Sequence, residues 1–497
     1  MKRGPWLAGV CAAFAVVGAL AQTQSPLERI TAGLTANGLK ADVSFLASDA
    51  LLGRATPSDG LDIAAEYIAA QFRRAGLEPA GDDGFFQIAH YSLVTPKREG
   101  LELTLETGGN PIRVDPAAIA FEETGAVALT HAPAVKLTAE NAAALAGQLS
   151  GKVVFLEIPN VAALPAGERQ KAVAEFVRLR VQAIGGKPAL LVGVDETTRR
   201  PAEAPPRMRE VSAPAATTPV LRVWGGPLRA ALHAAKPGLL DMTVSARIPE
   251  PAVRNVALRN VIGLLPGSDP ALKETYLVFS AHYDHVGTLP NGTGDRIFNG
   301  ANDNASGTAT VIEAANALAA LPEKPRRSIL FVTFFGEELG LVGSRYYVAH
   351  PVRPLAATVA NINLEQMGRT DDVEGRRLLQ FNATGFDFTN LMEVFRKAGA
   401  EAGIRLVKNN DKNEPFFSQS DNLPFADAGV PSTTLSVTYE FPDYHKPGDE
   451  WPKLDYDNMA KVDRAVVWGV WLLAEDPQAP HWNPNNPAAA RYSRARR

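Results

Sequence analysis

The chain of 497 residues contains one cysteine, Cys11, so the sequence excludes a disulfide framework and a cysteine-based zinc finger. It also lacks an excess of positive charge, because its formal net charge is -4 at pH 7. Proteins that bind nucleic acid normally carry a basic excess or a basic stripe, so we expect no nucleic-acid partner. The composition, 46% hydrophobic and 21% charged, is typical of a globular protein.

The N-terminal segment is typical of a signal peptide. Lys2 and Arg3 precede an uncharged, mostly apolar run over 6–20, and Ala19 and Ala21 are the small residues that a signal peptidase reads. The run is shorter than the roughly 20 residues of a membrane-spanning helix, although a membrane anchor is the alternative. We predict a signal peptide over 1–21, a secreted or periplasmic location, and no stable membrane anchor after cleavage.

The rest of the chain divides into segments with different residue patterns. Residues 22–94 are predicted to form the N-terminal part of the main domain. Within them, residues 27–90 read as helices around a short extended piece, and one helix is expected to end at Gly76. Residues 95–250 carry scattered short strand-like runs, which predict a separate, mostly β module inserted into the main domain. The tail over 477–497 holds arginines among Asn, Pro and Ala, and we expect it to be disordered.

Residues 251–476 show an α/β pattern. Helices are expected over 304–321 and 458–475. Short, near-continuous apolar runs suit strands buried on both faces of a mostly parallel sheet, and they lie at 261–265, 277–281 and 329–335. The order strand, helix, strand predicts an α/β fold, with a mixed, mostly parallel sheet flanked by helices.

Titratable side chains follow these strands at their carboxyl ends, which is where sites form in open parallel sheets. The residues that follow apolar runs in this way are His282, Asp284, His285, Glu337, Glu338, Glu365, Tyr444 and His445. A further acid, Asp303, lies where the first expected helix starts. The pattern therefore predicts imidazoles and several carboxylates at one rim of the sheet.

Each of these residues has a simpler interpretation when it is taken alone. Asp303 suits a helix N-cap, the pair Glu337 and Glu338 suits an exposed helix start, and His445 suits a surface turn. Taken together they favour a metal site, because each close pair of carboxylates costs about 4 kcal/mol at an effective dielectric near 20. Nitrogen and oxygen ligands without sulfur suit zinc, with manganese or cobalt as substitutes.

The motifs around these residues resemble those of the two-zinc exopeptidases of clan MH, family twenty-eight. That family includes co-catalytic zinc aminopeptidases and glutamate-carboxypeptidase-like enzymes. The matching motifs lie at 280–287, 299–307, 335–344, 363–368, 420–425 and 444–449. Residues 41–90 resemble the family's N-terminal segment through Gly53 and Arg54, and the inserted module is similar to a protease-associated domain.

The resemblance implies a role for each residue of the rim. His282 and Glu365 would bind one zinc ion, and Asp303 would bridge it to a second. Glu338 and His445 would complete the second site. Many members of the family carry Asp where this chain has Glu365, which is one methylene longer and can still bind a metal.

Three further residues would act on the reaction. Asp284 would hydrogen-bond the second ring nitrogen of His282 and fix its tautomer. Glu337 would be the general base that takes a proton from the attacking water. Tyr444 would donate a hydrogen bond to the developing oxyanion, or would serve only in packing.

The resemblance implies a zinc-dependent aminopeptidase with two Zn²⁺ ions that acts on peptide substrates. A carboxypeptidase or dipeptidase is the alternative, and it would need cations such as Arg345 or Arg369 near the metals. A catalytically inactive receptor-like protein is a further alternative. Apolar side chains that either line a specificity pocket or belong to the ordinary core are Phe416, Phe417, Phe425 and Tyr439.

Overall fold

The computed structural model describes residues 24–195, 197, 207–213, 218–408 and 416–493. The chain forms two compact units, the first within residues 1–89 and 258–497 and the second within residues 90–257. The second unit interrupts the first in the sequence, a few residues outside the predicted limits of 95 and 250. The predicted signal peptide lies outside the described residues.

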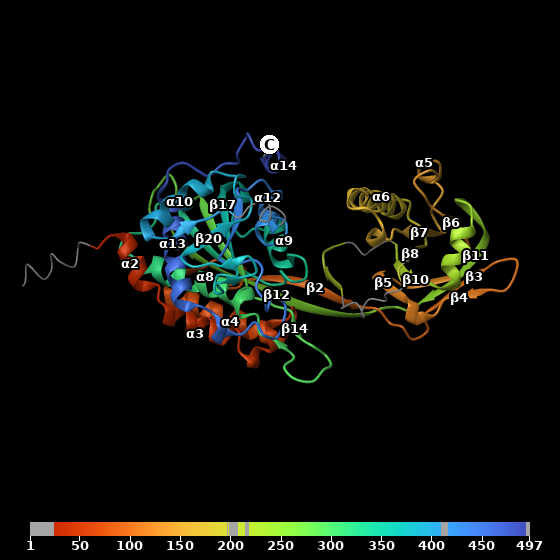
Figure 1. Ribbon diagram of the computed structural model, residues 1–497, viewed down its shortest axis with the longest axis horizontal. Coiled ribbons are helices and arrows are strands. Elements are labelled where there is room, and N and C mark those ends of the chain that lie inside the picture. Colours follow the sequence, from red (N-terminus) through yellow and green to blue (C-terminus); the bar gives the residue numbers. More distant parts are fainter. Residues whose placement is uncertain (1–23, 196, 198–206, 214–217, 409–415, 494–497) are drawn as a thin grey trace, which may run out of the picture. The chain divides into compact units, whose positions relative to one another are not determined.

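The first unit is built on a large twisted sheet (Figure 1). Strand β13 pairs in parallel with β16 and β17, and β17 pairs in parallel with β22, whereas β12 and β20 add antiparallel partners. The strands in spatial order are β12 (Ala252–Leu265), β16 (Ser328–Phe334), β13 (Tyr276–His282), β17 (Thr358–Glu365), β22 (Ser432–Ser436), β20 (Gln380–Ala383) and β21 (Arg405–Leu406). This order confirms the predicted mixed, mostly parallel α/β sheet.

Helices cover both faces of this sheet. Along β16, Phe331 packs against Phe72 of α4 (Asp59–Ala75), whereas Phe334 packs against Tyr347 of α9 (Val342–Ala349). Since side chains alternate between the faces of a strand, these contacts lie on opposite sides. The remaining long helices are α3 (Ala36–Leu46), α8 (Gly307–Ala319), α10 (Leu391–Ala402) and α13 (Tyr456–Glu475).

Local sequence sets the ends of α4. The Ser58 Oγ accepts a hydrogen bond from the backbone N–H of Leu61 at 3.1 Å, which caps the first turn. The helix ends at Gly76, whose φ of 79° lies in the left-handed region that favours glycine. The helix predicted to stop at Gly76 is therefore confirmed.

The second unit has its own sheet and its own core. Helices α5 (Ala142–Leu145), α6 (Ala166–Gly185) and α7 (Gly226–Ala234) accompany the strands. In spatial order the strands are β4 (Ile112–Arg113), β3 (Glu102–Glu106), β11 (Gly238–Ile248), β6 (Val127–Lys136), β7 (Val153–Ile158), β8 (Leu190–Asp195), β10 (Val220–Trp224) and β5 (Ile119–Glu123). Its resemblance to a protease-associated domain stays a prediction.

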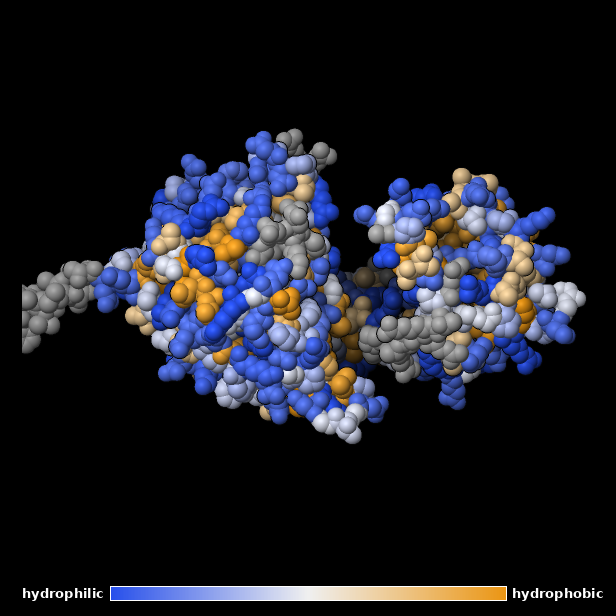
Figure 2. All heavy atoms as spheres, viewed as in Figure 1, coloured by the Kyte–Doolittle hydropathy of each residue, from blue (hydrophilic) through white to orange (hydrophobic). Residues whose placement is uncertain are grey.

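The face of each unit that Figure 2 shows is mainly hydrophilic, with hydrophobic side chains gathered in places. On α6 of the second unit, Val173, Val177 and Val181 are exposed at a spacing of four residues, so they share one face of the helix. No helix among the described residues is long and apolar enough to cross a membrane.

The structure corrects the expectation of a disordered C-terminal tail. Residues 477–493 do not form a disordered tail, because Trp482 and Tyr492 are buried in a cluster with Phe388 and Phe417. The two tail rings stack with their centroids 5.2 Å apart, and the Trp482 Nε1 donates to the carbonyl oxygen of Gly429 at 2.9 Å. The prediction was wrong because Asn, Pro and Ala dominate the composition of the tail, whereas only a few aromatic residues pack it against the core.

Asp42 on α3 gives a testable property of this core. It is 4% exposed, and the Tyr67 hydroxyl donates to its Oδ1 at 2.7 Å. Burial raises the pKa of Asp42 from 3.8 to about 7. Between about pH 4 and 7 the unfolded chain therefore releases a proton that the folded chain keeps, so this carboxyl makes stability fall as pH rises.

We predict that Asp42→Asn flattens this fall. The pH-dependent fall in the free energy of unfolding should shrink by up to about 4 kcal/mol, because the substitution removes a shift of roughly three pKa units at about 1.4 kcal/mol each. Urea unfolding of both proteins from about pH 4 to 8 measures it. The exposed Asp59→Asn is the control, and parallel stability curves for Asp42→Asn and the parent would contradict the prediction.

Candidate metal centre and active site

The carboxyl ends of the parallel strands collect the predicted residues. His282 is the last residue of β13 and lies in register with Phe334, the last residue of β16. Glu365 ends β17, which pairs with β13 on its other side. Glu337 and Glu338 lie three and four residues after the end of β16, so these side chains meet at the same edge of the sheet.

Asp303 reaches the same edge from an irregular segment. Helix α8 begins at Gly307, and Asp303 has φ -109° and ψ 94°, which are not helical angles. The backbone N–H groups of Asn302 and Asp303 both donate to the carboxylate of Asp449 at 3.0 to 3.1 Å. Asp303 is therefore not the N-cap of α8, and its carboxylate is turned toward the histidines.

The first group of candidate ligands is His282, Asp303 and Glu365. The Nε2 of His282 lies 3.4 Å from Asp303 Oδ1 and 3.3 Å from Glu365 Oε2. Glu365 therefore reaches the position expected of the shorter Asp in the family. Its other oxygen, Oε1, accepts a hydrogen bond from the Ser420 hydroxyl at 2.6 Å, which fixes the longer side chain.

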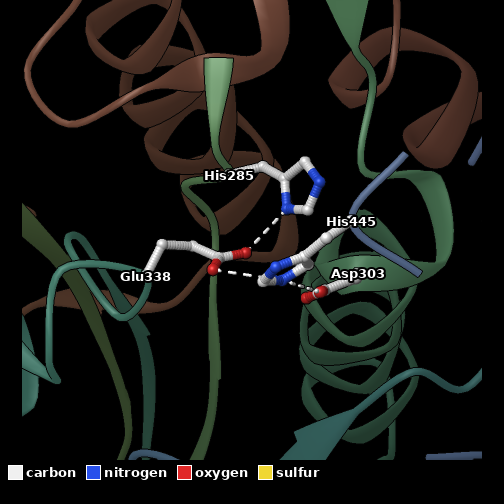
Figure 3. A group of neighbouring side chains, drawn as sticks. All are labelled: His285, Asp303, Glu338 and His445. Carbon is white, nitrogen blue, oxygen red and sulfur yellow. Dashed lines mark hydrogen bonds and ion pairs between the residues drawn. The ribbon is translucent and has the colours of Figure 1, made fainter. Parts of the chain in front are cut away.

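The second group is His285, Asp303, Glu338 and His445, and Figure 3 shows these side chains converging. The Nε2 of His445 lies 3.1 Å from Asp303 Oδ2 and 3.2 Å from Glu338 Oε2. The two oxygens of Asp303 thus face different groups, Oδ1 toward His282 and Oδ2 toward His445. This is the arrangement of a carboxylate that bridges two ions.

The spacing of these atoms fits zinc. Ligands about 2.0–2.1 Å from a tetrahedral zinc ion lie about 3.3 Å from one another, which matches the four distances between 3.1 and 3.4 Å. The buried His445 Nε2 has no hydrogen-bond partner among the described residues, although two carboxylate oxygens lie near it. A ring nitrogen that faces two carboxylate oxygens suits a position beside a cation.

Electrostatics supports the same interpretation. Burial alone would lower the pKa of His282, but Glu365 and Glu337 raise it well above 6.5. Burial would likewise lower the pKa of His445, but Asp303 and Glu338 raise it to about 10. Without metal the two imidazoles therefore hold protons as counter-charges, and metal binding must release them.

Asp284 lies between His282 and the backbone of Glu337. The Nδ1 of His282 is 3.4 Å from Asp284 Oδ1 and 3.2 Å from the carbonyl oxygen of the same residue. The other contacts of Asp284 are to Thr56 and to the Glu337 backbone N–H, which donates to Oδ1 at 3.1 Å. Burial raises the pKa of Glu337 well above 4.5, a direction that suits a general base.

Tyr444 lies at the mouth of the site. It is 44% exposed, and its ring stacks on that of His445 with the centroids 4.0 Å apart. The packing role and the hydrogen-bonding role predicted for Tyr444 are therefore compatible in one position.

Sequence reasoning named Arg54 and His285 but assigned neither a role in the site. Arg54 is completely buried, and its guanidinium donates to the carbonyl oxygens of Leu46, Tyr283, Asn299 and Gly300. It thereby ties the segment before Asp303 to the one after His282. His285 was noted after β13 but was given no role, and nothing in the sequence pairs it with Glu338, which lies far along the chain.

A cavity of about 160 Å³ opens beside the candidate ligands. The described residues that line it include the polar side chains of His282, Asp303, Glu337, Glu365 and Thr434 and the aromatic side chains of Phe416 and Tyr439. Phe416 stacks on Tyr439 with the centroids 5.0 Å apart. Phe417 and Phe425 instead pack in the core, as the alternative interpretation of these aromatic residues held.

Comparison with known proteins identifies the class. Residues 260–468 match the model of Peptidase family M28. This match confirms the resemblance drawn from the motifs.

The chain is similar to aminopeptidase YwaD of Bacillus subtilis (strain 168), with 28% identity over 236 residues, or 46% of this chain and 48% of YwaD. It is also 27% identical over 237 residues to a probable glutamate carboxypeptidase, VP8, of Zea mays, covering 45% of this chain and 31% of that protein. The chain thus spans about half, or less, of the length of these curated relatives.

The fold of the chain is also similar to that of a solved structure. The aminopeptidase from Aneurinibacillus sp. strain AM-1 matches 92% of this chain and 97% of its own, with a TM-score of 0.57 and 19% identity. At this identity the match establishes a shared fold, in agreement with the α/β architecture described above.

The bridging position of Asp303 leads to a prediction. Asp303→Ala should release at least one of two bound zinc equivalents, because both groups lose an oxygen. Metal analysis after dialysis against buffer of fixed free zinc measures the loss. Asp421→Asn is the matched control, since Asp421 is also buried but belongs to neither group. Two equivalents retained by Asp303→Ala would rule out the bridge.

Proposed function

We propose that the chain is a zinc-dependent aminopeptidase that holds two zinc ions. The observation that carries the proposal is the pair of ligand groups that share Asp303, beside a cavity that Glu337 also lines. His282, Asp303 and Glu365 would hold one ion, and Asp303, Glu338 and His445 would hold the other. The names of similar proteins, an aminopeptidase and a probable zinc metalloprotease among them, support this proposal.

Zinc bound at these residues would supply Lewis-acid chemistry, which lowers the pKa of water and polarises a carbonyl group. Glu337 accepts the proton of the attacking water and later delivers it to the amine of the departing peptide. Asp284 keeps both partners in place, since it contacts the His282 ring and accepts from the Glu337 backbone. The Tyr444 hydroxyl donates a hydrogen bond to the oxyanion that forms from the peptide carbonyl.

The charges around the cavity favour an amino-terminal substrate over a carboxyl-terminal one. Its described lining includes Glu337, Glu365 and Glu440 and no lysine or arginine, which suits a free ammonium group. Arg369 does not serve as the cation of a carboxypeptidase, because it pairs with Asp371 and Asp443. The other candidate, Arg345, donates to the carbonyl oxygen of Gly340.

A secreted or periplasmic location is a separate proposal. It rests on the sequence of residues 1–21. A mature N-terminus at Gln22 in protein recovered from outside the cytoplasm would support it, and an intact N-terminus would contradict it.

The direct test compares aminoacyl anilides that have a free amine with their N-acetylated forms. We expect two zinc equivalents and cleavage of the free-amine substrates alone, abolished by a chelator and restored by zinc. Two bound metals without such cleavage would move the search to carboxyl-terminal substrates. No metal and no activity after zinc is added back would favour the receptor-like alternative.

Two neighbouring glutamates provide a matched pair of variants. Glu337→Gln should lower kcat by about 10²–10⁴ because the general base is lost, while both zinc equivalents remain. Glu338→Gln should lose the zinc held with His445. The combination of metal analysis and steady-state kinetics separates the two effects, and full activity of Glu337→Gln would refute its role as the base.

The stacked pair of Phe416 and Tyr439 predicts a preference for apolar N-terminal residues. Phe416→Ala removes one apolar wall, so kcat/KM for leucyl over alanyl anilide should fall about tenfold. Phe45→Ala is the control, because Phe45 stacks on Tyr67 outside the cavity. An unchanged ratio would mean that the pair does not select the substrate.

A further inference from the structure

His285 is a buried imidazole that the proposed mechanism does not use. It lies three residues after His282, is 1% exposed, and approaches Glu338 with its Nδ1 2.8 Å from Oε1 (Figure 3). Its Nε2 is buried and has no hydrogen-bond partner among the described residues. The contact with Glu338 is therefore the ring's one hydrogen bond within the part of the chain that the structure describes.

The two oxygens of Glu338 face different partners. Oε2 lies 3.2 Å from His445 Nε2, which is close to the spacing of two ligands on one zinc ion. Oε1 lies 2.8 Å from His285 Nδ1, which is the length of a hydrogen bond from nitrogen to a carboxylate. This division leaves Oε2 for the metal and assigns Oε1 to His285.

The ring of His285 has little freedom to turn. Gly300 has φ 60°, and a Cβ at that residue would lie 2.5 Å from the His285 Cγ, so only glycine leaves room for the ring. The backbone N–H of His285 donates to the carbonyl oxygen of Arg54 at 3.2 Å. Because the Arg54 guanidinium in turn holds the Gly300 carbonyl oxygen, the ring and the Asp303 segment share one support.

We propose that His285 is a positioning residue for Glu338. It donates to Oε1 and so presents Oε2 to the ion held with Asp303 and His445. The inference rests on the proposed two-metal site, and it makes the two sites unequal. Loss of His285 weakens the site of Glu338 and His445, whereas the site of His282 and Glu365 has its own support in Ser420.

The test uses three variants of the full chain, and a fourth, His445→Ala, marks the site of Glu338 and His445. His285→Phe keeps a flat ring but has no donor, and His285→Asn places an amide N–H near the position of Nδ1. Ser420→Ala is the matched control for the other site, because it removes the hydrogen bond to Glu365. Zinc affinity of each metal-depleted protein is measured by competition with a chromophoric chelator, and thermal unfolding without metal reports the fold.

We expect His285→Phe to bind one of two zinc equivalents about 10- to 100-fold more weakly, which is the usual effect of losing such a partner. His285→Asn should recover most of that affinity. Substitution with Co²⁺ should show that the weakened site in His285→Phe is the one that is lost in His445→Ala, and that Ser420→Ala weakens the other.

Several results would overturn the inference. These are unchanged affinity in a folded His285→Phe, an equal loss at both sites, or an affinity of His285→Asn as low as that of His285→Phe. A zinc-loaded crystal structure with His285 bonded directly to the ion would also overturn it. Failure to bind zinc in the parent protein would instead refute the proposed two-metal function on which the inference rests.

Discussion

The carboxylate of Asp303 is the constraint on which the site depends. Its two oxygens face two histidines that come from distant segments, His282 at the end of β13 and His445 after β22. Asp303 can occupy this position because its segment is not yet helical and because Asp449 holds its backbone N–H. One carboxylate thus joins two ligand sets into one centre.

The cost of gathering several carboxylates explains much of the surrounding structure. Glu337, Glu338 and Glu365 lie with Asp303 in a buried setting where each close pair is unfavourable by about 4 kcal/mol at an effective dielectric near 20. Protonated imidazoles offset part of this cost without metal, and zinc would offset it more fully. The buried guanidinium of Arg54 adds a fixed positive charge nearby, and it ties together backbone segments that flank the ligands.

Much of this centre was predictable from the sequence, since parallel strands end at one edge and the acids and histidines follow them directly. What escaped prediction depends on contacts between distant segments. His285 lies within the motif at 280–287, but its contact with Glu338 joins residues that are 53 positions apart in the chain. Helix α8 begins at Gly307 and not at the predicted residue 304, because the backbone at Asp303 and Asn304 has non-helical angles. The tail packs through two aromatic rings, a signal too sparse for composition to reveal.

The central claim is that Asp303 bridges two zinc ions, and anomalous diffraction at the zinc edge tests it most directly. Crystals of the zinc-loaded protein should give two anomalous peaks, one beside each oxygen of Asp303. The peak near Oδ1 should contact His282 and Glu365, and the peak near Oδ2 should contact Glu338 and His445. A single peak, or two peaks that do not share Asp303, would contradict the account.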